Sequence, residues 1–433
     1  MPATLPATET ATSTTRKPAC RFCGATLRFT MVDLGSSPLC QTMLTAEQLD
    51  EMEPFYPLHV FVCAECSLVQ LEEYVAPAAI FSDYAYFSSY SESWLDHASR
   101  YVDDITERLG LDERSQVVEL ASNDGYLLQY FLAKGIPALG IEPAANVAAA
   151  AKAKGIPTLV EFFGVDLAER LAAQGLRPDL VCGNNVLAQV PDVNGFVAGI
   201  ATLLAPTGVV TIEFPHLFEL IALNQFDTIY HEHFSYFSFT AAYRIFAAHG
   251  LELWDVEGLP THGGSLRIYA RHAADRSRPA TRAVAEMLER EQRLGVDDLA
   301  TYAGFGARVA ATKRRLLSFL IEARDAGKTV VGYGAPGKGN TLLNYCGIRT
   351  DLLDYTVDRS PAKHGKYLPG TRIPVHRPEE IFRTRPDYVL ILPWNLRNEI
   401  VAQMAGIGEW GGRFVIPIPE VAVLDAAGRE VER

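Results

Sequence analysis

Short apolar segments alternate with helical segments from residue 116 to residue 213, and this alternation constrains the fold more than any other feature. The expected strands are 116–120, 138–142, 156–160, 179–183 and 208–213, and the expected helices between them are 127–134, 146–154 and 165–174. Alternating elements of this length are typical of a doubly wound, mainly parallel α/β sheet. Ligands bind at the carboxyl ends of such strands, so polar residues at those ends are candidates for a binding site.

The first of these strands ends in a loop that resembles the cofactor loop of class I S-adenosylmethionine (SAM) methyltransferases. That loop has the pattern E/D-x-G-x-G-x-G, and a carboxylate after the next strand binds the ribose hydroxyls. Only one of its three glycine slots holds glycine here, so an ordinary strand-to-helix turn stays open as an alternative. The residues that this resemblance assigns to SAM, together with two asparagines at a later strand end, are Glu119, Ala121, Asn123, Gly125, Glu142, Asn184 and Asn185.

A second unit of the same kind follows a strand at 328–331. The next residues, Gly332-Tyr-Gly-Ala-Pro-Gly-Lys-Gly-Asn340, match G-x-G-x-x-G. Gly339 stands where a P-loop needs a hydroxyl for Mg²⁺, so a P-loop NTPase is unfavoured. Asp354 and Asp358 flank the next expected strand, and another strand is expected at 388–392. We expect a smaller Rossmann-like domain that binds a phosphate or pyrophosphate at a helix N-terminus.

Four cysteines have the spacing of a metal site. Cys20 and Cys23 form one C-x2-C pair, and Cys63 and Cys66 form a second. Two such pairs can present four thiolates to one tetrahedral Zn²⁺. Because four thiolates leave no open coordination position, the predicted zinc is structural. The other three cysteines, Cys40, Cys182 and Cys346, are expected to be small buried side chains.

The sequence Tyr230-His231-Glu232-His233 places a phenol, two imidazoles and a carboxylate in four consecutive residues, with aromatic residues on both sides. This composition is typical of a proton-transfer site or a metal site. Histidine titrates near neutral pH, which suits a general base. We expect a neighbouring carboxylate to raise the pKa of the base, and we favour structural roles for His231 and His216.

Length and charge limit the remaining possibilities. The 433 residues favour two or three domains, expected at 18–75, 76–305 and 306–433, after a disordered tail at 1–17. The net charge of −13 disfavours nucleic acid or an anionic membrane as a partner. The chain has no apolar run long enough for a membrane span. We expect a cytoplasmic protein, with helical sequence at 282–317 linking its last two domains.

Ordered motifs along almost the whole chain resemble SAM-dependent C-methyltransferases of nucleotide-activated deoxysugars, in particular the tetronitrose-type C-3′ enzymes. The motifs begin at Cys20 (CRFC), Tyr84 (YAYFSS), Glu119 (ELASNDGY), Ile141 (IEPAANV), Asn184 (NNVLA), Tyr230 (YHEHFSY), Thr261 (THGGSLR), Gly332 (GYGAPGKGN) and Pro393 (PWN). The resemblance implies an N-terminal zinc-ribbon-like domain, a class I SAM domain and a C-terminal Rossmann-like domain. It also implies SAM and structural zinc as cofactors, and a dTDP-4-keto-6-deoxysugar as substrate.

The resemblance also assigns roles to individual residues. His233 is implied as the general base, with Glu232, Tyr230, Tyr84 and Gln189 as further catalytic residues. The residues implied to contact the nucleotide sugar are Tyr333, Gly334, Lys338 and Asn340. Gln189 departs from the family pattern, which often has histidine at this position. Glutamine can donate and accept hydrogen bonds, but it does not titrate near neutral pH.

Three alternatives stay open at this point. The first is a metallo-hydrolase that uses His231 and His233 as metal ligands. The second is a nicotinamide-dependent nucleotide-sugar oxidoreductase that uses the loop at Gly332. The third is a non-catalytic zinc-ribbon binding protein with a degenerate SAM fold. The nature of the sugar, methylation at C3 or C5, and the oligomeric state are not fixed by the sequence.

Overall fold

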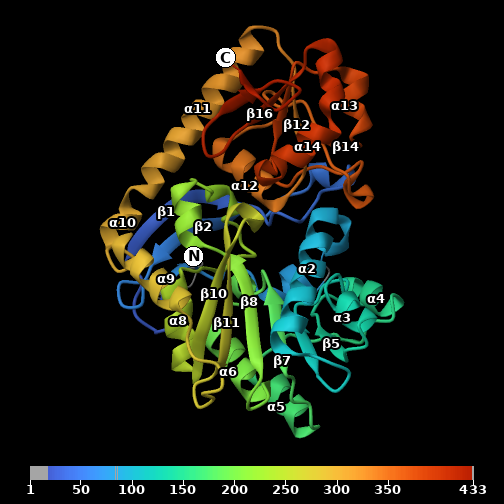
Figure 1. The fold of residues 1–433 in the computed structure, drawn as a ribbon. Helices are drawn as coiled ribbons and strands as arrows, with labels where there is room; N and C mark the ends of the chain where they lie inside the picture. The colour runs from blue at the N-terminus through green and yellow to red at the C-terminus, as the bar shows by residue number, and fades with distance from the viewer. Residues whose placement is uncertain (1–17, 83, 85, 432–433) are drawn as a thin grey trace, which may run out of the picture.

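The structure is a computed structural model that describes residues 18–82, 84 and 86–431. The predicted tail at 1–17 lies outside the described residues. Three sheets form the molecule: a four-stranded N-terminal sheet, a seven-stranded central sheet and a seven-stranded C-terminal sheet. The C-terminal sheet and the central sheet lie at opposite ends, and the N-terminal strands β1 and β2 lie between them (Figure 1).

The N-terminal sheet is antiparallel and has the order β1-β2-β3-β9. Its strands are β1 (Phe29–Ser37), β2 (Tyr56–Val62), β3 (Val69–Leu71) and β9 (Ser235–Tyr236). The last strand comes from the part of the chain that directly follows Tyr230–His233. Val69 of β3 pairs with Tyr236 of β9. The N-terminal sheet is therefore completed by the residues that directly follow the predicted general base.

The central sheet has the order β10-β11-β8-β7-β4-β5-β6. Its strands are β4 (Val117–Leu120), β5 (Ala138–Ile141), β6 (Thr158–Leu159), β7 (Leu180–Asn184), β8 (Val209–Pro215), β10 (Leu251–Leu259) and β11 (Ser265–His272). The strands β8-β7-β4-β5-β6 are parallel, as the alternating pattern predicts. The strands β10 and β11 form an antiparallel extension next to β8, which the sequence did not indicate.

Helices cover both faces of the central sheet. They are α2 (Glu92–Leu109), α3 (Leu128–Ala133), α4 (Ala145–Ala153), α5 (Val165–Ala173), α6 (Val193–Leu203) and α8 (Phe239–Ala248). The short α7 (Leu217–Ala222) instead packs into the buried cluster that includes the N-terminal and C-terminal sheets. Neighbouring residues of one strand enter different cores: Val117 packs with side chains from α2 and α3, and Val118 packs with side chains from α5, α6 and α8. Two-sided burial explains why these strands read as continuous apolar runs.

The C-terminal sheet has the order β14-β13-β12-β15-β16-β17-β18 and is parallel up to β16. Its strands are β12 (Val330–Tyr333), β13 (Thr356–Val357), β14 (Val375–His376), β15 (Tyr388–Ile391), β16 (Arg413–Ile416), β17 (Ala422–Leu424) and β18 (Glu430–Val431). Its helices are α12 (Gly337–Cys346), α13 (Glu379–Thr384) and α14 (Arg397–Gln403). This topology confirms a second Rossmann-like unit.

The link between the two larger sheets is not one continuous helix. It consists of α9 (Arg282–Arg293), α10 (Leu299–Ala303) and the long α11 (Phe305–Asp325), which runs along one edge of the molecule (Figure 1). Gly295, with a φ of +80°, interrupts the helical sequence, and Asp298 caps α10 by accepting from the Ala300 amide. Val309 and Leu316 of α11 belong to the same buried cluster as Val60 and Leu71 of the N-terminal sheet. None of the described helices is long and apolar enough to cross a membrane.

Candidate active site and zinc site

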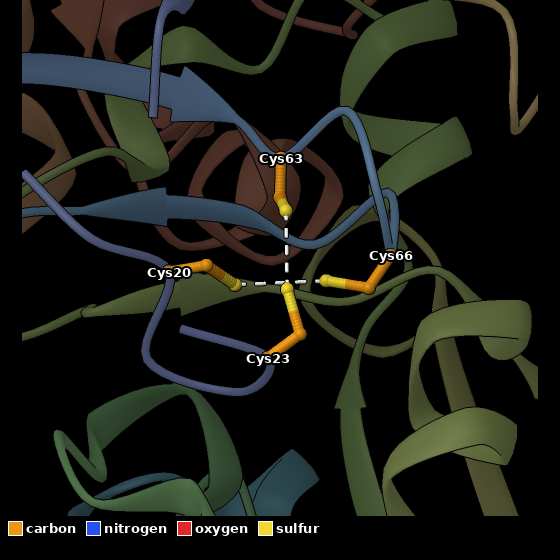
Figure 2. A group of neighbouring side chains, drawn as sticks. All are labelled: Cys20, Cys23, Cys63 and Cys66. Atoms are coloured by element: carbon orange, nitrogen blue, oxygen red, sulfur yellow. Dashed lines mark hydrogen bonds between the residues drawn. The ribbon is translucent and has the colours of Figure 1, made fainter. Parts of the chain in front are cut away.

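The two C-x2-C pairs form one cluster, in which the four sulfur atoms point toward a common centre (Figure 2). All ligand atoms lie within 4.8 Å of one another, and the Sγ atoms of Cys20 and Cys66 are 3.5 Å apart, as are those of Cys23 and Cys63. A tetrahedral zinc with Zn–S bonds of about 2.3 Å needs sulfurs about 3.8 Å apart, so the cluster fits zinc. Gln70 Nε2 also lies 3.1 Å from the Cys20 sulfur and can donate to it.

The N-terminal sheet holds the segment Tyr230–His233 in place from one side. The Leu71 amide donates to the Phe234 carbonyl over 3.0 Å. His231 directs Nε2 toward the Pro57 carbonyl at 3.1 Å and the Tyr56 carbonyl at 3.2 Å. His231 is therefore a buried structural residue, as expected. His216, the other histidine with an expected structural role, binds Glu291 over 2.7 Å and is 1% exposed.

A cavity of about 1160 Å³ lies between the central and C-terminal sheets, at the carboxyl ends of their parallel strands. Predicted residues from every group except the zinc ligands line it: Tyr84, Ala121, Asn123, Glu142, Asn184, Asn185, Gln189, Tyr230, Glu232, His233, Tyr333, Gly334 and Lys338. The predicted residues Glu119, Gly125 and Asn340, although described, are buried outside this lining. The cavity therefore brings together segments more than 200 residues apart in sequence.

The loop after β4 keeps the backbone of a glycine-rich turn without the glycines. Ala121, Asn123 and Gly125 all have positive φ, at +56°, +50° and +76°. Glycine is required only at Gly125, where a Cβ atom would lie 2.1 Å from Ile156 Cδ1. Asparagine tolerates the left-handed conformation, whereas alanine adopts it at a cost. The three slots therefore have the expected conformation, which explains why the departure from the glycine pattern leaves the loop intact.

Glu142 is fixed at the end of β5 by the loop itself. Its Oε2 accepts from the Asn123 amide over 2.9 Å, and its Oε1 accepts from the Ala144 amide over 2.8 Å. This carboxylate lines the cavity, whereas Glu119 lies beneath the loop and is fully buried. Burial raises the pKa of both carboxyl groups. Of the two acidic residues, only Glu142 can contact a ligand in the cavity.

The end of β7 contributes Asn184 and Asn185 to the cavity. The Asn184 amide donates to the Tyr126 hydroxyl over 3.3 Å, and Asn185 Nδ2 donates to His262 Nε2 over 2.9 Å. His262 has a φ of +54°, and its ring lies edge-on to Trp94 with 5.0 Å between centroids. Burial lowers the pKa of His262 to about 4. The structure places His262, which follows Thr261 in the motif THGGSLR, in the cavity wall.

One ring nitrogen of His233 makes a hydrogen bond to the backbone, and the other keeps a lone pair that can accept a proton. Its Nδ1 lies 2.9 Å from the Thr228 carbonyl, which can only accept, so Nδ1 carries the proton and Nε2 keeps its lone pair. The Tyr230 ring packs against the imidazole with 4.1 Å between centroids. Burial lowers the pKa of His233 to about 4. The expectation that a neighbouring carboxylate raises this pKa is wrong, because Glu232 binds other partners.

Glu232 is buried and joins two segments that are distant in sequence. Its Oε2 accepts from the Tyr84 hydroxyl over 2.9 Å, and its Oε1 accepts from the Cys40 thiol over 3.2 Å. Burial raises the pKa of Glu232. Cys40 is buried, as expected, but its hydrogen bond to an active-site carboxylate was not anticipated. No sequence pattern could have indicated this contact between residues 192 positions apart.

The first turn of α12 supplies a partly buried ammonium group. Lys338 Nζ donates to Asn395 Oδ1 over 2.8 Å and lies 5.0 Å from the centre of the Trp394 ring. Trp394 Nε1 in turn donates to Asp227 over 2.7 Å. Burial lowers the pKa of Lys338 and raises that of Asp227 to about 6. Lys338 therefore faces the cavity with a neutral amide as its hydrogen-bond acceptor.

The two acidic residues that flank β13 have different surroundings. Asp358 lines the cavity, accepts from the Ala335 amide over 2.8 Å and pairs with Lys363 over 3.3 Å. Asp354 lies outside the cavity lining and pairs with Arg324.

The turn after β12 requires glycine at Gly334. This residue has a φ of +93°, and a Cβ atom there would lie 2.5 Å from Pro393 Cδ. Tyr333 donates to Gln403 over 3.0 Å.

Comparison with protein families divides the chain into three matched segments. Residues 20–81 match the model described as "Putative zinc binding domain", residues 94–256 match "Methyltransferase domain", and residues 260–419 match "C-methyltransferase C-terminal domain". Together with the four-cysteine cluster, these matches establish SAM and a structural zinc as the cofactors.

A curated relative matches nearly the full length. The C-methyltransferase NovU of Streptomyces niveus is 39% identical over 412 residues, which cover 94% of this chain and 97% of that protein. Solved structures match part of the chain. An S-adenosylmethionine-dependent methyltransferase from Clostridium acetobutylicum is 9% identical with a TM-score of 0.34, and covers 42% of this chain and 92% of its own. The PH0226 protein from Pyrococcus horikoshii is 13% identical with a TM-score of 0.37, and covers 47% and 99%. The near full-length match to NovU shows that this chain belongs to the family of SAM-dependent C-methyltransferases.

Proposed function

We propose that this C-methyltransferase transfers the methyl group of SAM to a ring carbon, C3′, of a dTDP-4-keto-6-deoxysugar, with His233 as the general base. The observation that carries the proposal is the position of the His233 imidazole. It lines the cavity between the loop after β4 and the loop after β12, with Nδ1 bound to a carbonyl and Nε2 available. A base between a methyl-donor end and a phosphate-binding end is what carbon methylation of a nucleotide sugar requires.

The chemistry begins with the acidity of a carbon next to a ketone. The 4-keto group makes the C3′ proton removable, and His233 Nε2 accepts that proton to leave an enolate. The lowered pKa keeps the imidazole unprotonated at neutral pH, so the base is in its reactive form before the substrate binds. The enolate carbon then forms a bond to the methyl carbon while the bond from methyl to sulfur breaks. SAM supplies the electrophilic methyl group.

Hydrogen-bond donors around the base can stabilise the negative charge on the enolate oxygen. The Tyr230 ring packs on His233, and Tyr84 donates to buried Glu232. Gln189 lines the same part of the cavity, where an amide can donate without titrating. Preorganised donors in a site shielded from water act most strongly where charge develops in the transition state. We assign Tyr230 and Gln189 to this task. Tyr84, whose single hydroxyl proton is donated to Glu232, is assigned to positioning that carboxylate beside the base.

The two ends of the cavity suit the two ligands. At the loop after β4, the left-handed turn and the fixed Glu142 carboxylate suit the methionine part and the ribose hydroxyls of SAM. At the other end, Lys338 at the start of α12 and Lys363 after β13 line the cavity, and these cations suit the pyrophosphate of dTDP. Such an enzyme would act in the cytoplasm, in the biosynthesis of a branched deoxysugar of the kind found in antibiotics.

Incubation with SAM and a panel of dTDP-4-keto sugars, followed by mass spectrometry, tests the proposal. We expect one keto sugar to gain a single methyl group, and its dTDP-4-hydroxy counterpart to gain none. Deuterium at C3′ should wash into the keto sugar in D₂O when S-adenosylhomocysteine (SAH) replaces SAM. Methylation at oxygen, or equal methylation of the 4-hydroxy sugar, would contradict the enolate route. A thermal-shift comparison of SAM, SAH, dTDP and NAD separates this function from a nicotinamide-dependent oxidoreductase.

A further inference from the structure

A short segment between α1 (Pro77–Phe81) and α2 contacts both the cofactor loop and the proton-transfer group. It comprises Tyr84 and Tyr86–Ser91 and is called the tyrosine strap below. Most of its described residues line the cavity. Its aromatic side chains are not packed into a core, because Tyr86 is 44% exposed and Tyr90 is 61% exposed. Its position therefore depends on polar contacts.

Two asparagine side chains bind the backbone of the tyrosine strap, each with both of its polar atoms. Asn123 Oδ1 accepts from the Ser88 amide over 2.8 Å, and Asn123 Nδ2 donates to the Tyr86 carbonyl over 3.1 Å. Asn146 Oδ1 accepts from the Tyr84 amide over 3.1 Å, and its Nδ2 donates to the Tyr84 carbonyl over 2.8 Å. These paired hydrogen bonds imitate those between two backbone strands.

Asn123 occupies a slot in which the class I methyltransferase pattern has glycine. Its φ of +50° is the conformation that glycine adopts there, so the loop backbone does not explain why asparagine is present. Glycine would give the same turn without the side chain. What asparagine adds is the pair of hydrogen bonds to the tyrosine strap, and this side chain is 7% exposed.

Asn123 also lies between the cofactor carboxylate and the base. Its backbone amide donates to Glu142, and its side chain holds the strap whose Tyr84 hydroxyl donates to Glu232. Glu232 directly precedes His233 in sequence. A continuous series of hydrogen bonds and backbone therefore runs from the proposed ribose ligand to the proposed general base. In it the Asn123 side chain joins the loop after β4 to the strap at Tyr86 and Ser88.

We propose that Asn123 is a positioning residue, which uses the glycine slot of the cofactor loop to hold Tyr84 and Glu232 in place for proton abstraction. This inference rests on the proposed function, because it assumes that Tyr84 and Glu232 serve the carbon acid chemistry. The polar tie between Asp124, Ser89 and Lys154 supports the strap a short distance away, so loss of the Asn123 contacts displaces the strap without releasing it.

The decisive variant is Asn123→Gly, because glycine preserves the positive φ and removes only the side chain. We expect the dissociation constant for SAH to stay within about threefold, and the turnover number to fall on the order of 10- to 100-fold, as a misplaced catalytic group does. In amide hydrogen exchange, the peptide that contains Ser88 should lose protection, and peptides from α4 should not.

A matched control is Asn224→Gly. Asn224 is also a buried asparagine with positive φ, at +53°, but its side chain donates to Thr312, away from the cavity. We expect its turnover and strap protection to equal those of the parent protein. A second variant, Asn123→Asp, keeps the acceptor for the Ser88 amide and loses the donor to the Tyr86 carbonyl, so it should lie between the parent and Asn123→Gly. Zinc content and circular dichroism verify the fold of each variant.

Three results would overturn the proposal. Parent turnover in Asn123→Gly would show that the strap needs no such support. Weaker SAH binding with parent turnover would make Asn123 a cofactor contact. An equal loss in Asn224→Gly would show a general effect of removing a buried asparagine. Failure of the proposed function would give another result. The parent protein would show no deuterium wash-in with any keto sugar, while hydrogen exchange at Ser88 would still show whether the Asn123 side chain holds the strap.

Discussion

The two ends of the cavity are built from the same structural unit but differ in charge. At each end a loop follows a parallel strand, and a carboxylate at the end of the next strand accepts from a loop amide. Glu142 accepts from the Asn123 amide over 2.9 Å, and Asp358 accepts from the Ala335 amide over 2.8 Å. In both loops the acidic residue therefore fixes the turn as well as facing the cavity.

The difference lies in the cations. Asp358 is paired with Lys363, and Lys338 adds a further ammonium group whose acceptor is a neutral amide. Among the described residues, none of the ion pairs involves Glu142. The loop after β4 therefore presents negative charge, which suits ribose hydroxyls and a sulfonium, and the loop after β12 presents positive charge, which suits phosphates. We infer that charge around the loop, and not the glycine pattern, decides which ligand each unit takes.

The largest effect is expected at His233, which belongs to neither end. Replacement of His233 by Asn removes the base and keeps a side chain that can bind the Thr228 carbonyl. We expect turnover to fall by about 10²- to 10⁴-fold, the usual contribution of a general base, while SAH and dTDP bind as before. Calorimetric titration with SAH and with dTDP, together with the methylation assay, measures binding and turnover separately. Parent turnover in the variant would remove His233 from the mechanism.

Lys338→Met should weaken the binding of dTDP and leave the binding of SAH unchanged. Losing a charged hydrogen bond of about 1.5–3 kcal/mol should weaken dTDP binding by about 10- to 100-fold, and SAH binding should not change. Arg314→Met serves as a control, since this cation does not line the cavity. If SAH binding weakened as much as dTDP binding, the assignment of the two ends would be wrong.

Glu142→Gln should have the opposite selectivity and a smaller effect. The amide keeps the shape but loses the charge and one of the two acceptors for the Asn123 and Ala144 amides. We expect SAH to bind about 5- to 10-fold more weakly, for a loss of about 1–1.4 kcal/mol. The dissociation constant for dTDP should stay at the parent value, and calorimetry measures both.

Local pattern predicted the parallel part of both large sheets and the zinc ligands, and most of the predicted site residues line the cavity. The contacts it missed join distant strands. The β10–β11 extension carries Arg267, whose buried ion pair with Glu213 places a charge inside the sheet, where a pattern search expects an apolar residue. His97 of α2 binds the same Glu213 over 2.9 Å and lines the cavity, although nothing in its neighbourhood in the sequence marks it.

Sequence also failed to predict the partners of Glu232, although this carboxylate directly precedes His233. Tyr230–His233 forms a tight turn, closed by the His233 amide donating to the Tyr230 carbonyl over 2.9 Å. In this turn Glu232 reaches Tyr84 and Cys40, while His233 reaches the Thr228 carbonyl. Proximity in sequence suggested a raised pKa for the base. Burial, which depends on the assembled cavity, lowers it instead.

The smallest effect, and the one most specific to this cavity, is the pH dependence. The value of kcat/KM for the sugar reports the free enzyme, in which the pKa of His233 is about 4. The rate should therefore stay level as the pH falls through 6.5 and decline toward 4, because protonation removes the base. An inflection near 6 that disappears in Asp227→Asn would belong to Asp227, whose pKa is about 6. Stability also changes with pH. The lowered pKa values of His233 and His262 make their contribution to the free energy of unfolding fall between about pH 6.5 and 4, whereas the raised pKa of Asp227 contributes in the opposite direction. Unfolding measured at each pH separates the two effects. An inflection near 6.5 that persists in Asp227→Asn would show that the base is more exposed to water than the cavity implies.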